Sequence, residues 1–337
     1  MSVEIAHRNS GTPAEPAKIA RRRWPSGFRQ YVVPVLLLGE IALFSALSKN
    51  FLTSDNLANV LLNSVDLALI ACGLTFVILL GGIDISTGPA LGVVAWVVGT
   101  LTVMGTPAVA VLAMAVVLGC LMGLLNGILI SLFNVTAIIA TLGTAAVWQT
   151  VLFSLWGGSD LFAPPISAFA SSHRTFGMPT VAFFVLAIYL ALWYVSRCRA
   201  YGRHVFAVGN DAEGARLSGV RVGRVRIATY SLVGAMVGLG AIVYVARVGV
   251  VQASSGSDLS LAAIAAVVVG GTSITGGRGS VIGTLFGVLF IAVLQNGVVL
   301  TGVPPLWNGV LVGAFIVIAV GIDVTGERLS QRRRLSR

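Results

Sequence analysis

Long apolar runs fill most of this chain, and they constrain its fold more than any other feature. The ten runs are about residues 31–49, 60–80, 89–104, 107–133, 135–156, 178–196, 225–248, 259–271, 280–300 and 307–324. A helix needs roughly 20 mostly apolar residues to cross a bilayer, and most of the runs come close to that length. The mean hydropathy of +0.94 and the 10% of charged residues are not those of a soluble protein. We expect an all-α polytopic membrane protein with about ten transmembrane helices.

The basic residues indicate how the chain is oriented. Most of the 22 lysines and arginines lie in three stretches, residues 1–30, 197–226 and 325–337. Short basic loops are retained on the cytoplasmic side of a membrane. We therefore predict that both termini and the central stretch are cytoplasmic. This divides the chain into an N-terminal tail (1–30), a transmembrane domain (31–324) with the cytosolic loop 197–226, and a C-terminal tail (325–337).

Several classes of function are disfavoured by what the sequence lacks. The arginines adjoin apolar runs, which argues against a nucleic-acid-binding surface. Neither lysine, Lys18 or Lys49, ends a glycine-rich phosphate-binding loop. No His, Cys, Asp or Glu cluster has the spacing of a metal site, and no nucleophile stands beside a histidine. We expect no catalytic residue, metal or cofactor in this chain.

A polar segment, GGIDISTGP at residues 81–89, interrupts the apolar pattern and contains Asp84. An unpaired acid at a helix centre costs roughly 2.5–3.5 kcal/mol. The segment is either a plain turn, in which Ser86 or Thr87 caps the following helix, or an irregular segment that lines a hydrated path. The sequence leaves both interpretations open.

A weak internal echo links this segment to a second one. Asp66–Gly82 resembles Asp258–Gly271, and the latter leads into GGTSITGGRGS at residues 270–280. Paired interruptions in the two halves of a transporter are the best sequence indication of a binding site. We take these residues as candidates for lining a solute path: Asp84, Ser86, Asn126, Thr141, Thr272, Ser273 and Asn296.

Polar residues also lie inside the apolar runs. Each favours a structural role on its own, because a hydrogen bond between membrane helices contributes about 0.6 kcal/mol on average. Together they could also line a path for a hydroxylated ligand. They are Glu40, Asn63, Asp66, Asn126, Thr141, Thr144, Gln149, Gln295 and Asn296.

The basic loop 197–226 contains a helix signal. Asn210 followed by Glu213 is a capping-box pattern, and Gly219 is a natural stop. We expect a short helix over 211–218. It is either a simple connector or a rigid, exposed element on which a soluble partner docks.

Several motifs in the same order resemble the ribose-type sugar permeases of bacterial ABC importers, a family that includes autoinducer-2 permeases. The similarity covers about residues 45–324. The motifs are FLT at 51–53 with Asn56, Leu57 and Asn59, GGIDIS at 81–86, TLGT at 141–144, GGS at 157–159, Gly202-Arg203, ARLSG at 215–219 and AAVVVGGTSITGGRG at 265–279.

The resemblance implies a permease subunit in the bacterial inner membrane that imports a monosaccharide or a similar small polyol. A separate ATPase would bind the ATP, a periplasmic sugar-binding protein would deliver the substrate, and a second permease subunit, identical or not, would complete the path. The implied coupling residues are Asn210, Asp211, Glu213, Arg216, Leu217, Ser218 and Gly219. One alternative is an ion-coupled secondary transporter, whose carboxylate would be Asp84, Asp66 or Glu40. Another is a channel or scaffold protein without energy coupling.

Overall fold

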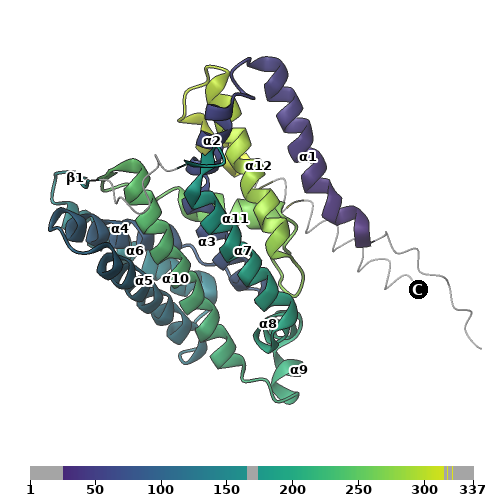
Figure 1. Cartoon of the computed structure of the whole chain (residues 1–337). Coiled ribbons are helices and arrows are strands. Elements are labelled where there is room, and N and C mark those ends of the chain that lie inside the picture. Colours follow the sequence, from purple (N-terminus) through teal and green to yellow (C-terminus); the bar gives the residue numbers. More distant parts are fainter. Residues whose placement is uncertain (1–25, 165–173, 315–316, 318–320, 322–337) are drawn as a thin grey trace, which may run out of the picture.

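The computed structural model describes residues 26–164 and 174–314, together with residues 317 and 321, and the described chain is mostly helical (Figure 1). The predicted tails 1–30 and 325–337 and the tenth apolar run lie wholly or partly outside the described residues. The helices are α1 (Ser26–Leu47), α2 (Ser54–Asn63), α3 (Val65–Leu79), α4 (Thr87–Val103), α5 (Ala108–Ser131), α6 (Ala137–Trp156), α7 (Thr180–Cys198), α8 (Ala200–Asn210), α9 (Ala212–Leu217), α10 (Val222–Val248), α11 (Leu259–Val269) and α12 (Val281–Leu300).

Each of the first nine apolar runs overlaps a helix over most of its length. Five helices, α5, α6, α7, α10 and α12, are long and apolar enough to cross a membrane. The pair α2 and α3, bent by 44° at their junction, forms a sixth candidate span. The helices α4 and α11 are shorter apolar helices, as their runs predicted. The described chain thus has five to six candidate spans.

Helix α10 lies at the centre of the packing and contacts α3, α4 and α5. Glycines make the contact with α5 close: a Cβ atom on Gly119 or Gly123 would overlap backbone atoms of α10, and one on Gly234 would overlap α5. Small residues let membrane helices approach in this way, because lipid provides no hydrophobic drive for their association. These glycines therefore act as packing residues where α5 and α10 meet.

A buried ion pair joins α3 to α10. Arg247, in the last turn of α10, donates from Nη2 to Oδ2 of Asp66 at 2.6 Å. The Asp66 side chain is 1% exposed, and Arg247 also donates to Asn63 at 3.2 Å. An unpaired buried charge is costly, so this pair gives Asp66 and Asn63 the structural role expected from sequence.

Two opposite ends of the molecule are useful landmarks (Figure 1): α2 lies at one end and α9 at the other. Two antiparallel strand pairs supplement the helices. In the first, β1 (Leu161–Phe162) pairs with β4 (Val250–Val251), and in the second, β2 (Arg174–Thr175) pairs with β3 (Met178–Pro179). The ion pair Arg174–Asp55, at 2.8 Å, ties the second pair to the first turn of α2.

Candidate functional site

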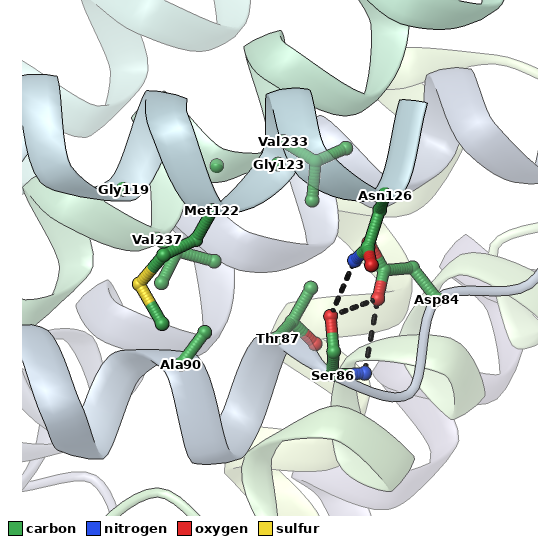
Figure 2. Close-up of a pocket in the computed structure, with 11 residues that line it drawn as sticks. Asp84, Ser86, Thr87, Ala90, Gly119, Met122, Gly123, Asn126, Val233 and Val237 are labelled. Atoms are coloured by element: carbon green, nitrogen blue, oxygen red, sulfur yellow. Dashed lines mark hydrogen bonds between the residues drawn. The ribbon is translucent and has the colours of Figure 1, made fainter. Parts of the chain in front are cut away.

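The segment between α3 and α4, residues 80–86, is irregular and holds a buried acid. We call it break 1. Gly81, its second residue, has φ +77°, a conformation that a side chain would strain. Asp84 is 2% exposed, and its Oδ1 accepts hydrogen bonds from the Ser86 amide at 2.9 Å and the Ser86 hydroxyl at 2.6 Å (Figure 2). The acid is therefore buried and hydrogen-bonded rather than placed in an exposed turn.

The hydrogen-bond network continues from break 1 into two other helices. Asn126 of α5 donates from Nδ2 to the Ser86 hydroxyl at 2.8 Å (Figure 2), and Thr144 of α6 donates to Asn126 Oδ1 at 2.8 Å. Thr141 of α6 donates to the Ile83 carbonyl at 3.1 Å. Four of the predicted path residues, Asp84, Ser86, Asn126 and Thr141, are thus brought together, and Thr144 joins them. We call Asp84, Ser86, Asn126, Thr141 and Thr144 the acidic network.

A small cavity adjoins the acidic network (Figure 2). One side of its lining is polar and the other is apolar, and in this conformation the space between them is too small for a monosaccharide. It lies between α4, α5 and α10, and its lining residues are Asp84, Ser86, Thr87, Ala90, Gly119, Met122, Gly123, Asn126, Val233, Gly234 and Val237.

Two residues near break 1 were missed by the sequence analysis. The hydroxyl of Tyr230 is buried without a hydrogen-bond partner among the described residues, and a Cβ atom on Gly82 would lie 2.6 Å from it. Ser260 of α11 accepts from the Gly88 amide at 2.6 Å and donates to the Ile85 carbonyl at 2.7 Å. Tyr230 lies in no motif, and Ser260 lies in the segment that resembles Asp66–Gly82, but only the tertiary structure brings the two residues to break 1.

The capping prediction for α4 was only partly right. Ser86 occupies the N-cap position, but its hydroxyl makes no cap hydrogen bond. It binds Asp84 instead, and the Gly88 amide in the first turn is satisfied by Ser260. The start of α4 is therefore held by α11.

The second irregular segment, residues 270–280, is break 2, and it lies outside the acidic network. Ser273 and Thr275 share a hydrogen bond between their hydroxyls at 3.0 Å. The Thr272 hydroxyl is buried without a partner among the described residues. The seventh predicted path residue, Asn296, lies elsewhere and exchanges two amide hydrogen bonds of 2.9 Å with Asn56 of α2.

The basic loop contains two helices where the sequence predicted one. Helix α8 (Ala200–Asn210) was not predicted, and Asn210 is its last residue rather than the cap of the next helix. The true N-cap is Asp211, whose Oδ1 accepts from the amides of Glu213 at 3.1 Å and Gly214 at 3.0 Å. The capping prediction was therefore off by one residue, because α8 continues through Asn210.

The predicted short helix exists as α9, and its surface is charged. Arg216 binds Glu213 through two hydrogen bonds of 3.0 and 2.6 Å, and both side chains are largely exposed. The Arg216 guanidinium lowers the pKa of the Glu213 carboxyl. Leu217 is 78% exposed, and Gly219 ends the segment with φ +85°, as expected for a stop.

The chain matches a family model over residues 56–320, and the family is described as the branched-chain amino acid transport system / permease component. The chain belongs to this family. Its similarity to the ribose-type permeases, inferred from motifs, is confirmed, and it is a transport subunit rather than an enzyme. Among the described residues, no group of three or more His, Cys, Asp or Glu side chains is placed to hold a metal ion.

Three named relatives are permeases of import systems. The ribose import permease of Escherichia coli K12 is 35% identical, over 86% of this chain and 92% of that protein. The fructose import permease of Rhizobium meliloti is 36% identical, over 86% and 83%. The autoinducer 2 import permease of Salmonella typhi is 32% identical, over 87% and 85%. No solved structure matches the chain significantly.

Proposed function

We propose that this permease forms the translocation path of an ATP-driven importer for a monosaccharide or a similar small polyol. The observation that carries the proposal is the acidic network beside the cavity, which places a carboxylate, an amide and hydroxyls at a helix break inside the membrane domain. Relatives named for ribose, fructose and autoinducer 2 support a small hydroxylated solute.

The chemistry of the cavity fits such a solute. A carboxylate oxygen accepts hydrogen bonds from hydroxyls, and an amide or hydroxyl both donates and accepts. The cavity lining includes one acid, Asp84, and no basic residue, so it suits a neutral polyol better than an anion. We place Asp84, Ser86, Asn126 and Thr141 on the path, with Thr272, Ser273 and Asn296 as further contacts as the solute moves.

Energy would enter through α9. The exposed helix, with its N-cap at Asp211, presents Glu213, Arg216 and Leu217 to a partner, and ATP would bind to that separate ATPase chain. The α9 end would then be cytoplasmic and the α2 end periplasmic, in a bacterial inner membrane with about ten spans and cytoplasmic termini. A sugar-binding protein would dock at the α2 end, and a second permease subunit would complete the path.

The test is transport by the reconstituted complex. The chain is co-purified with its ATPase, placed in liposomes with the binding protein, and assayed for uptake of labelled ribose, fructose and autoinducer 2. We expect uptake that requires ATP and is lost, by at least tenfold, when Glu213 and Arg216 are both charge-reversed. Uptake by the chain alone, driven by a proton or sodium gradient, would support a secondary transporter instead.

A further inference from the structure

We propose that Gly209, at the end of α8, is a positioning residue that links α9 to break 2 by direct backbone contact, and to break 1 through Leu79 at the end of α3 and through Gly276. This inference rests on the proposed function in one respect: it takes α9 as the element on which the ATPase acts. It adds the route by which a displacement of α9 reaches the solute path.

The first contact is with the end of α3. Gly209 lies against the carbonyl oxygen of Leu79, the last residue of α3, and a Cβ atom on Gly209 would overlap that oxygen. The same carbonyl accepts a hydrogen bond from the amide of Gly277, in break 2, at 2.9 Å. One carbonyl group therefore touches both α8 and break 2, and it lies five residues before Asp84.

The second contact is between α8 and break 2. A Cβ atom on Gly276 would lie 2.9 Å from the Gly209 carbonyl oxygen and 2.8 Å from the Gly81 amide nitrogen. A Cβ atom on Gly277 would lie 3.0 Å from the Asn210 Cα atom. Gly276 and Gly277 have φ of +86° and +71°, a region that favours glycine. Three chain segments thus meet through backbone atoms, with little side chain between them.

Backbone contact of this kind has a mechanical consequence. A side chain between two elements can change rotamer and absorb a small displacement, whereas close-packed backbone atoms transmit it. Gly209 is two residues before Asp211, the N-cap of α9. A shift of α9 is therefore passed to the end of α3 at Leu79, to break 2 at Gly276 and, through Gly276, to break 1 at Gly81.

The experiment compares Gly209→Ala with Gly223→Ala in the reconstituted complex. Alanine is a better helix former than glycine at both sites, but a Cβ atom on Gly223 meets only the Ser131 Cβ atom, at 3.9 Å. We expect Gly209→Ala to assemble with the ATPase and keep basal ATP hydrolysis, while substrate-stimulated hydrolysis and uptake fall at least tenfold. Gly223→Ala should match the wild type in all four measurements. Unchanged uptake by Gly209→Ala would overturn the proposal.

If Gly209→Ala does not assemble with the ATPase, a disulfide cross-link between α8 and break 2 tests the proposal instead. A Cβ atom on Gly277 would lie 3.2 Å from the Asn210 Cβ atom, which is close to disulfide distance. In a variant with Asn210→Cys and Gly277→Cys, without the native cysteines, the rate of cross-linking is measured in the resting and the nucleotide-trapped complex. Rates equal within twofold support a joint that moves as one body. A tenfold slower rate in the trapped complex would overturn it.

These results are distinct from a failure of the proposed function. If charge reversal of Glu213 and Arg216 leaves uptake intact, α9 is not the site of ATPase action, whatever Gly209→Ala does. If that double variant loses uptake and Gly209→Ala does not, α9 remains the site of ATPase action and the proposed role of Gly209 is wrong.

Discussion

The two breaks occupy equivalent places after the two similar segments of the sequence, yet different interactions stabilise them. Break 1 carries a buried acid, and its side chains bind one another and α5. Break 2 contains no acid, and backbone hydrogen bonds shape it, including Ser273 amide to Arg278 carbonyl at 2.8 Å. Under the proposed function, break 1 would offer polar groups to the solute, and break 2 would serve mainly as a joint between backbone segments.

The helices that follow the breaks show a second comparison. The start of α4, after break 1, is held by Ser260 of α11. The start of α12, after break 2, is held against α3 by a hydrogen bond of 2.7 Å between the hydroxyls of Thr284 and Thr75. Each helix after a break is therefore fastened to the helix before the other break, so the two halves interlock.

The largest expected effect comes from removing the acid of break 1. Asp84→Ala leaves the buried amide and hydroxyl of Ser86 without their acceptor, which costs about 1–3 kcal/mol each time a buried group is unpaired. We expect uptake to fall by about two orders of magnitude and thermal stability in detergent to drop. Asp84→Asn keeps one acceptor oxygen and should retain more stability. Full uptake by Asp84→Ala would remove the distinction between the breaks.

The interlocking contacts should have intermediate and unequal effects. Ser260→Ala removes the acceptor for the Gly88 amide and the donor to the Ile85 carbonyl. We therefore expect the free energy of unfolding to fall by about 1–3 kcal/mol. Thr75→Val removes one hydrogen bond between helices, worth about 0.6 kcal/mol. Denaturation of the two variants in the same detergent measures the difference. Equal losses of unfolding free energy in the two variants would show that the starts of α4 and α12 are held equally strongly.

Thr272→Val tests break 2 with a smaller change. Its hydroxyl has no partner among the described residues, so an isosteric methyl group should leave stability within about 0.5 kcal/mol of the wild type. If the hydroxyl meets the solute in transit, the KM of uptake rises by roughly threefold to tenfold. A loss of stability as large as that of Asp84→Ala would contradict a break held mainly by its backbone.

The pH dependence of coupling is expected to be the smallest effect. The pKa of Glu213 is lowered by Arg216, so the carboxylate and its ion pair are present above the ordinary pKa and are lost only as the pH falls through the lowered one. Between about pH 6 and about pH 8 the pair stays charged. The pH profile of uptake should therefore have the same shape for the wild type and for Glu213→Gln. A titration in that range that Glu213→Gln abolishes would contradict this.

Apolar runs located the helices well, because the bilayer requires long apolar segments whatever their partners are. The same signal could not find α8, whose sequence AYGRHVFAVGN is polar on one face and lies in a basic loop. Missing α8 also displaced the predicted cap from Asp211 to Asn210. Local spacing allowed both residues, and only the helix that precedes them excludes Asn210.

The candidate path could be predicted only in part. Asn126 and Thr141 stand out as polar residues inside apolar runs, Asp84 and Ser86 stand out in the polar segment between two runs, and the structure groups all four. Nothing in the sequence separates them from Asn296, which pairs with Asn56 at a distance of 240 residues along the chain. Long-range pairing of this kind depends on the packing of helices, which periodicity does not encode.

The Asp66–Arg247 ion pair can form only after both residues have been synthesised. Its partners are 181 residues apart, so the acid leaves the ribosome roughly 10 to 40 seconds before the arginine at ordinary rates of synthesis. Until α10 has been made, Asp66 lacks the cation that it pairs with in the folded protein. An unpaired acid at the centre of a membrane helix costs roughly 2.5–3.5 kcal/mol, so we expect α3 to reach its final buried position only when α10 packs against it.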